Sequence, residues 1–201
     1  MKKPTLYTIA KALENSPYPF FTKPYSVNLG GIRDVDNLES NAFNDLIYAI
    51  YTNSDGELRG VVVNATTDAG LYYRENPLNV KGTAILIPGC YRSVYQLKDN
   101  GHKGYRAFRQ VKNMDYYRDA DRDGELEMVG GVSSEIALTN LHHAGQNSTQ
   151  VDKWSAGCQV VGSMKDWDKL LEVGETQIRN GLGDKFSYTL FHSDEFDRLT
   201  L

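Results

Sequence analysis

The strongest structural signal in the chain is the stretch Leu46-Ile47-Tyr48-Ala49-Ile50-Tyr51, then Asn53-Ser54-Asp55-Gly56, then Leu58-Arg59-Gly60-Val61-Val62-Val63. Two runs rich in β-branched and aromatic residues flank a turn that contains Asp-Gly, which predicts a β-hairpin. The fold class we expect is mainly β with a few helices, arranged as a mainly antiparallel sheet or barrel. Runs of the same kind predict further strands at Thr83–Ile87, Arg92–Leu97, Ala107–Val111, Ile136–Leu141, Cys158–Val161 and Phe186–Phe191.

Helical patterns stand out near both ends of the chain. Leu6, Ile9, Ala10 and Leu13 recur at the spacing of one helical face, and we expect that face to pack against the core. A second helix is predicted to begin at Ser163, which can cap it together with Asp166. Its apolar stripe is Trp167, Leu170 and Leu171, and Gly174 is expected to stop or kink it.

The chain of 201 residues is expected to form one substantial domain. Residues 1–40 are predicted to be an N-terminal helix and a proline-punctuated extended arm, and residues 41–201 the main domain. No apolar run approaches the length of about 18 residues that a membrane-spanning helix needs, so no membrane insertion is expected. The formal net charge of −4 argues against nucleic acid as a partner.

The N-terminus lacks the apolar stretch and the cleavage site of a secretion signal. We therefore expect the protein to be cytoplasmic when it is synthesised.

The densest group of chemically capable residues lies in Asn140-Leu141-His142-His143 and in Ser155-Ala156-Gly157-Cys158. A thiol nucleophile needs an imidazole that takes its proton, and two histidines precede Cys158 closely. A glycine before the cysteine allows a tight turn, in which main-chain N–H groups of Gly157 and Cys158 could receive an oxyanion. These residues predict acyl-transfer chemistry.

On these residues the sequence resembles the L,D-transpeptidase catalytic domain, the YkuD-like family, whose signature is a histidine followed by a Ser-x-Gly-Cys turn. Ser155-Ala156-Gly157-Cys158 fits that turn, and the interval 158 − 142 = 16 fits the usual separation of the two residues. The resemblance implies an L,D-transpeptidase-like β-sandwich or barrel, and it covers about residues 140–162. It also implies bacterial peptidoglycan stem peptides as the partner and no cofactor.

The resemblance further implies that Cys158 attacks a peptide carbonyl and forms a thioester, with His142 as the base. His143 would point to the opposite face of a strand and is the second candidate. Ser155 would brace the turn or the histidine, and Asn140 is a weaker candidate to orient an imidazole. The reaction would be hydrolysis, by an endopeptidase or carboxypeptidase, or else transpeptidation.

Two features depart from the family. Members commonly carry an arginine two residues after the cysteine, where this chain has Val160, so the substrate must be anchored differently. The expected absence of an export signal suggests a phage-encoded wall enzyme, released to the periplasm or cell wall at lysis like an endolysin, or carried on a virion. The alternative is a non-catalytic wall-binding or virion structural module that retains the fold. Candidate replacements for the missing arginine are Arg92, Arg106, Arg109 and Arg118.

Other interpretations compete with the catalytic one. Cys158 could be a buried small hydrophobe, and Cys90, with no histidine close in sequence, is expected to be a structural thiol. His142, His143 and Cys158 could bind zinc, but the second cysteine of a zinc knuckle is missing, so no metal is expected there. His102, between Gly101 and Lys103, is expected to lie in a solvated turn.

The acidic stretch Asp119-Ala120-Asp121-Arg122-Asp123-Gly124 resembles the start of a calcium-binding loop, because carboxylates alternate and glycine stands sixth. The twelfth position is Gly130, where such a loop carries a glutamate, so the pattern is incomplete. From sequence we favour a solvated acidic turn over a calcium site at Asp119, Asp121 and Asp123.

Overall fold

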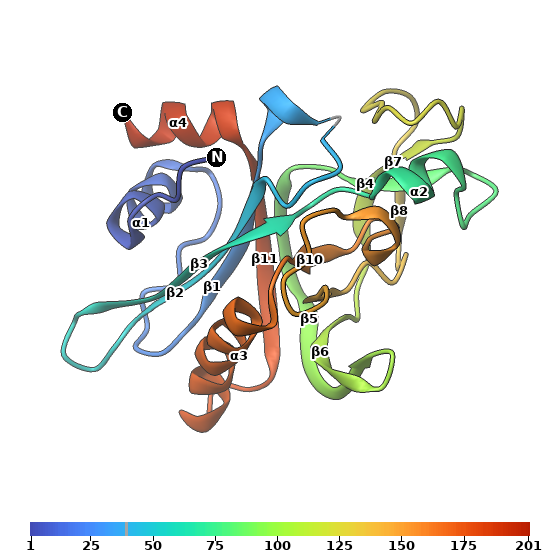
Figure 1. Ribbon diagram of the computed structural model, residues 1–201. Helices are drawn as coiled ribbons and strands as arrows, with labels where there is room; N and C mark the ends of the chain where they lie inside the picture. Colours follow the sequence, from blue (N-terminus) through green and yellow to red (C-terminus); the bar gives the residue numbers. More distant parts are fainter. Residues whose placement is uncertain (39) are drawn as a thin grey trace.

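A computed structural model describes residues 1–38 and 40–201. Strands hold 37% of the residues and helices 22%, which confirms the prediction of a mainly β protein. The strands form one closed barrel and a separate three-stranded sheet, with helices packed on the outside of the barrel (Figure 1).

The barrel joins eight strands, and only two of its neighbouring pairs are parallel, β1 with β11 and β9 with β10. The predicted hairpin is confirmed, because β2 and β3 pair antiparallel in one unbroken register from Asp45 opposite Ala65 to Thr52 opposite Leu58. Around the barrel the order is β1 (Asn28–Arg33), β11 (Lys185–His192), β5 (Gly89–His102), β6 (Tyr105–Gln110), β9 (Leu141–His143), β10 (Gln159–Val161), β3 (Leu58–Thr66) and β2 (Asp45–Thr52).

The sequence of strand β2 is apolar without interruption because both faces of the strand are buried. Successive side chains of a strand point to opposite faces. Ile47 and Ala49 belong to the larger core, together with Trp167 and Leu170 of helix α3 (Met164–Arg179). Leu46, Tyr48 and Ile50 belong to a second core with residues of α1 (Leu6–Asn15) and α4 (Ser193–Thr200). Both faces of the strand are buried, so alternation with polar residues is lost.

Helices α1 (Leu6–Asn15) and α4 (Ser193–Thr200) lie side by side against that second core (Figure 1). The apolar face predicted for the first helix is confirmed, because Ile9, Ala10 and Leu13 are buried there. Lys11 donates hydrogen bonds to the carbonyls of Thr200 and Leu201, and Asn15 donates one to the carbonyl of Leu199. The two ends of the chain are thus fastened to each other.

Helix α3 (Met164–Arg179) begins as predicted, since the Ser163 side chain accepts a hydrogen bond from the Asp166 N–H. Gly174 does not stop the helix, because it continues to Arg179. Glycine is needed there for packing, since a Cβ at Gly174 would lie 2.8 Å from Cζ of Phe108. Within the described part of the chain, no helix has the length and apolar character needed to span a lipid bilayer.

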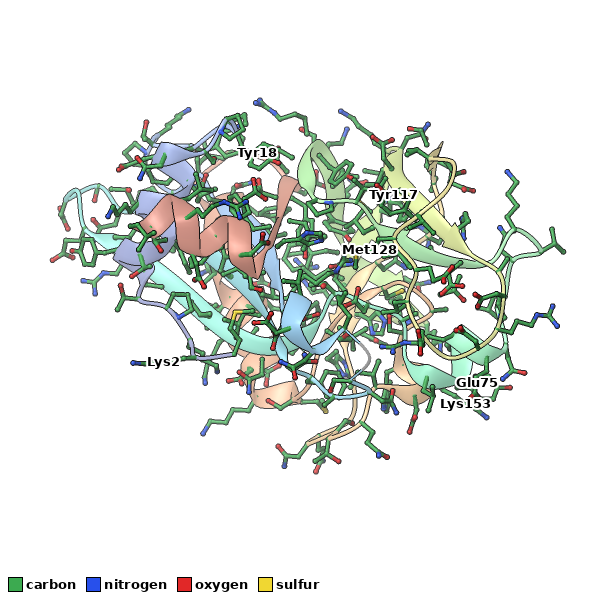
Figure 2. All side chains as sticks on the ribbon, turned by 90° about the horizontal axis from the view of Figure 1, so that it is seen from above. Lys2, Tyr18, Glu75, Tyr117, Met128 and Lys153 are labelled. Carbon is green, nitrogen blue, oxygen red and sulfur yellow. The ribbon has the colours of Figure 1, made fainter. Side chains whose placement is uncertain are left out.

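The small sheet covers one end of the barrel and has the order β4 (Thr83–Leu86), β7 (Met114–Asp119) and β8 (Ser133–Glu135). The short helix α2 (Leu71–Glu75) lies beside it (Figure 1). Figure 2, seen from above, places Glu75 and Lys153 at this end of the molecule and Lys2 toward the other. Short 3-10 helices occur at Val35–Asn37 and Asp152–Trp154.

Two sequence-based expectations need correction. The strand predicted over Ile136–Leu141 does not form, because Leu138 adopts a φ of +60°, and only β9 at Leu141–His143 continues as a strand. The extended arm is shorter than expected, since residues 28–33 form β1, which pairs with both β11 and β2. Strands β1, β7 and β8 were not predicted from sequence.

Candidate active site

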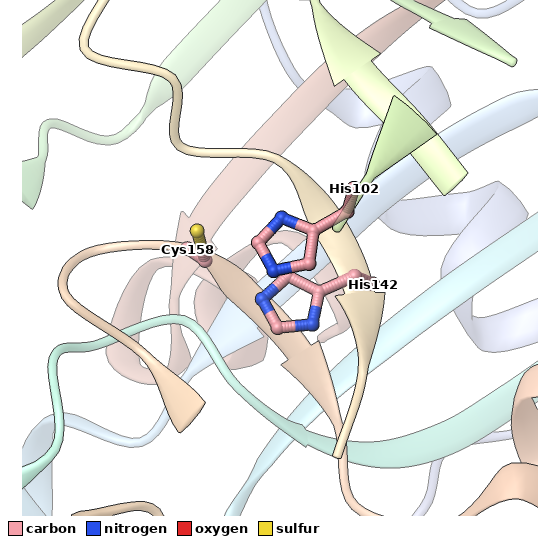
Figure 3. A group of neighbouring side chains, drawn as sticks. All are labelled: His102, His142 and Cys158. Carbon is pink, nitrogen blue, oxygen red and sulfur yellow. The ribbon is translucent and has the colours of Figure 1, made fainter. Parts of the chain in front are cut away.

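The site is built where two parallel barrel strands begin. Strand β9 carries His142, and Cys158 immediately precedes its neighbour β10, whose Gln159 N–H donates to the Asn140 carbonyl at 3.0 Å. This pairing brings together residues that are sixteen positions apart (158 − 142 = 16). A nitrogen of His142, a nitrogen of His102 and Sγ of Cys158 all lie within 4.8 Å of one another. Figure 3 shows both rings on the same side of Cys158.

His142 is held in one tautomer. Its side chain is buried, and Nδ1 lies 2.9 Å from the His143 carbonyl oxygen, to which it donates a hydrogen bond. The Tyr105 hydroxyl is also close to Nδ1, at 3.1 Å. A proton on Nδ1 leaves a lone pair on Nε2, and Nε2 is buried without a hydrogen-bond partner among the described residues. His142 therefore presents a free base nitrogen inside the site.

The turn before the cysteine is braced by Ser155, which is fully buried. Its hydroxyl donates to the Cys158 carbonyl at 2.8 Å and accepts the Gly157 N–H at 3.1 Å. Gly157 has a φ of +112°, and a Cβ there would lie 2.6 Å from the Ala84 carbonyl oxygen, so only glycine fits.

The Gly157 N–H is thus already engaged and does not face a substrate, contrary to the sequence-based expectation. The Cys158 N–H donates no hydrogen bond to any described residue.

The thiol of Cys158 is protonated in the resting site. Burial raises its pKa to about 11, and Sγ donates to the Leu138 carbonyl at 3.7 Å. Leu138 holds its φ of +60°, which bulky residues rarely adopt, and such strain concentrates at functional sites.

His142 is neutral near pH 7, because burial and the neighbouring His102 lower its pKa to about 3. The pair is therefore a thiol beside a neutral imidazole and not a preformed ion pair.

A second histidine, His102, belongs to the site, and the expectation of a solvated turn is wrong. It ends strand β5 and stacks on His142 with ring centroids 3.8 Å apart and an interplanar angle of 8°. The residue before His102 is Gly101, where any side chain would collide with the Ala107 backbone of β6. Glycine at this position therefore allows β5 to continue beside β6 as far as His102. No local pattern reveals this contact, because it arises from the pairing of β5, β6 and β9.

Asn140 orients His102 and not His142. Its Oδ1 accepts the Gln110 N–H at 2.9 Å, which turns its amide nitrogen toward Nδ1 of His102 at 3.3 Å. Nδ1 of His102 is therefore the acceptor, and the hydrogen of this ring sits on Nε2. Burial lowers the pKa of His102 to about 4, so this ring is also neutral.

The other candidates lie outside this group. The Nδ1 of His143 contacts the Ala144 carbonyl, and its ring packs between Tyr105 and Trp167. Cys90 lies on β5 opposite Thr189, and both cysteines are free, so no Cys90–Cys158 disulfide forms. Asp119 ends β7, and Asp121 and Asp123 lie in the loop that follows it.

His102, His142 and Cys158 are chemically a donor set that zinc accepts. An imidazole nitrogen binds a metal ion in the plane of its ring, and these two planes are nearly parallel and stacked. One ion cannot lie in both planes unless a ring turns, so the arrangement does not fit a centre that uses both histidines. The zinc set considered from sequence fails for a further reason, because His143 points elsewhere.

A cleft of about 430 Å³ opens above Cys158 and His102. Trp154 and Leu138 contribute apolar walls, and Lys103, Lys153 and Arg118 contribute positive charge. The Arg118 guanidinium is paired with Glu135 at 2.9 Å, whereas Lys103 has no ion pair among the described residues.

Of the four arginines considered from sequence, only Arg118 lines this cleft. Arg92 lies over the Phe21 ring, and Arg106 pairs with Asp99 and Glu175. Val160 is fully buried.

Comparisons of the chain with profiles of protein families, with curated proteins and with solved structures find no match. The chemistry of the site must therefore be argued from its own geometry.

Proposed function

We propose that this protein is a cysteine-dependent acyl-transfer enzyme of L,D-transpeptidase-like fold that acts on peptidoglycan stem peptides. The observation that carries the proposal is the free, buried Nε2 of His142, fixed in its tautomer beside the Cys158 thiol. A buried polar atom without a partner costs free energy, and such atoms are typical of functional sites. The substrate class rests on the resemblance of the Ser-x-Gly-Cys turn and its histidine to that family.

In the proposed first step the Cys158 thiol proton moves to Nε2 of His142 while Sγ bonds to the substrate carbonyl carbon. His142 acts as a general base at the moment of attack, because the two pKa values disfavour an ion pair beforehand. The imidazolium then gives its proton to the leaving amine as the C–N bond breaks, which leaves a thioester on Cys158.

The oxyanion formed in this step needs hydrogen-bond donors. We assign the Cys158 N–H and the Nε2–H of His102 to this role, because the first is free and the second belongs to a ring that lines the cleft. The two stacked rings then have complementary tasks: His142 accepts a proton and His102 donates a hydrogen bond.

The second step divides hydrolysis from transpeptidation. Water attacks the thioester in hydrolysis, and an acceptor amine attacks it in transpeptidation, with His142 again as the base. We favour hydrolysis, by an endopeptidase or carboxypeptidase. Lys103, which is free of ion pairs within the described residues, and Arg118 are proposed to hold a substrate carboxylate in place of the arginine that Val160 replaces.

The decisive experiment incubates wild type, Cys158→Ala and Cys90→Ala with purified peptidoglycan of several chemotypes and follows the muropeptides by mass spectrometry. Wild type and Cys90→Ala are expected to yield shortened stems, and Cys158→Ala none. Exchanged or longer stems would indicate transpeptidation. Identical profiles for all three proteins would reject the catalytic proposal and favour a non-catalytic wall-binding or virion module.

A further inference from the structure

The end of β7 and the loop that follows it carry five carboxylates at alternate positions, those of Asp119, Asp121, Asp123, Glu125 and Glu127. No lysine or arginine of the described residues forms an ion pair with any of them. An acidic loop of this kind repels itself unless a cation enters it.

Asp119 supplies an independent observation. The residue is only 4% exposed, and its Oδ2 is buried without a hydrogen-bond partner. The backbone N–H groups of Asp121 and Glu127 face its carboxylate, which places that carboxylate inside the loop. A buried carboxylate oxygen with no donor is costly, and a bound cation would satisfy it.

We propose that residues 119–127 bind one calcium ion. The ligands would be the carboxylates of Asp119, Asp121, Asp123 and Glu127 and the main-chain carbonyl of Glu125. These are positions 1, 3, 5, 9 and 7 of a calcium loop, and hard oxygen ligands of this kind suit Ca²⁺.

Two further positions of the loop agree with this assignment. Gly124, at the sixth position, has a φ of +91°, and Leu126, at the eighth, is buried. Gly130 supplies no bidentate carboxylate at the twelfth position, so the affinity is expected to be modest, with a Kd between about 10⁻⁵ and 10⁻³ M. Water would complete the coordination.

The loop is connected to the walls of the cleft. Arg118, which lines the cleft, directly precedes Asp119. The Arg74 side chain of α2 donates to the Gly124 carbonyl at 3.5 Å, and Glu75 also lies against Gly124. An ion in the loop would therefore hold one wall of the cleft in place. The proposed ion site does not depend on the chemistry assigned to Cys158.

The test is calcium binding to the full chain, followed by titration calorimetry and by thermal unfolding in Ca²⁺, Mg²⁺ or chelator. We compare wild type with Asp121→Asn/Asp123→Asn, which changes two exposed ligands, and with Asp168→Asn/Asp197→Asn, which removes two exposed charges elsewhere. Wild type and the control should bind one Ca²⁺, and their Tm should rise by about 5–10 °C at Ca²⁺ about 100-fold above Kd. The loop variant should lose both effects.

Several outcomes would overturn the proposal. No heat of binding and no Tm shift at Ca²⁺ up to about 0.1 M, which is about 100-fold above the weakest expected Kd, would do so, as would an equal shift in the loop variant. An equal response to Mg²⁺ would indicate general screening of negative charge, since Mg²⁺ demands a tighter octahedral site. Circular dichroism of the loop variant in chelator shows whether it is folded, and wild type in chelator gives the matching reference.

Discussion

Two of the buried polar groups in this protein differ in whether they contain an ion pair. Arg33, which is fully buried, meets Asp68 at 2.8 Å and donates to the carbonyls of Leu86 and Thr67. Asp45 accepts the N–H groups of Asp34 and Thr67. The Arg33 charge is thus paired with a carboxylate, and Oδ1 of Asp68 has this ion pair but no hydrogen bond among the described residues.

The group around Cys158 contains no ion pair among the described residues. His142 leaves Nε2 bare, and the ring stacked on it, His102, is neutral. No carboxylate forms an ion pair with either histidine among the described residues. An ion pair stabilises the first group, whereas the second keeps a buried imidazole nitrogen without a partner among the described residues.

The largest effect expected is on activity, from His142→Gln. Loss of the general base should lower the rate of muropeptide release by about 10²–10⁴-fold. The matched control is His143→Gln, which should stay within about threefold of wild type because the His143 ring contacts Tyr105 and Trp167 and is not part of the group with Cys158. Equal losses in the two variants would remove His142 from the base position. Release is followed by mass spectrometry under initial-rate conditions.

The second largest effect is expected on stability, when Arg33 is replaced and its ion pair with Asp68 is lost. Arg33→Met leaves Asp68 buried without its ion-pair partner, and such a change costs about 3–5 kcal/mol of unfolding free energy. Arg198→Met, which removes an exposed pair with Asp194, should cost no more than about 1 kcal/mol. Urea denaturation measures both variants. A loss of similar size in the two would mean that Arg33 contributes little to the barrel.

A change of pH should affect the stability contributions of His142 and Asp45 in opposite directions. The folded pKa of His142 is lowered from 6.5 to about 3, so only the unfolded chain takes up this proton, and the unfolding free energy falls as pH drops below about 6.5. Asp45 acts oppositely, because burial and Asp68 raise its pKa from 3.8 to about 7, and its contribution is lost as pH rises toward 7. His142→Gln removes the first effect alone.

Urea unfolding at several pH values between about 4 and 6.5 measures this linkage. The slope of unfolding free energy against pH should be smaller in His142→Gln than in wild type by about 1.4 kcal/mol per pH unit, the value for one proton. An unchanged slope would show that His142 titrates alike in the folded and unfolded chains.

The smallest effect expected concerns the hydroxyl beside Nδ1 of His142. Tyr105→Phe removes a contact of 3.1 Å but leaves the hydrogen bond to the His143 carbonyl. We expect muropeptide release to slow by about 2–10-fold, as for one neutral hydrogen bond, with KM unchanged. A loss as large as that of His142→Gln would make the hydroxyl, and not the carbonyl, the group that fixes the tautomer.

Local patterns were enough to predict several elements. The hairpin over residues 46–63 follows from two β-rich runs and an Asp-Gly turn, and the start of α3 follows from Ser163 and Asp166. The candidate pair Cys158 and His142 was also found in sequence, because both lie in one motif, and the structure brings them together. Their catalytic role remains a prediction.

Other features could not be predicted because they depend on neighbours that are distant in sequence. Gly174 looked like a helix stop but leaves room for the Phe108 ring. Strand β1 was hidden, since Gly30 and Gly31 have low strand propensity. Glycine is needed at both positions because the Tyr48 hydroxyl lies too close to Gly30, and the Tyr188 hydroxyl too close to Gly31, to leave room for a Cβ.

By itself, the sequence determined the β-rich class, the hairpin, the two principal helices and the motif around Cys158, because these depend on periodicity, caps and turns within a few residues. Only the tertiary structure decided that His102 stacks on His142, that Val160 is buried and that Lys103 and Arg118 line the cleft. These relations arise from strand pairing across long stretches of chain, where packing and burial outweigh local preference.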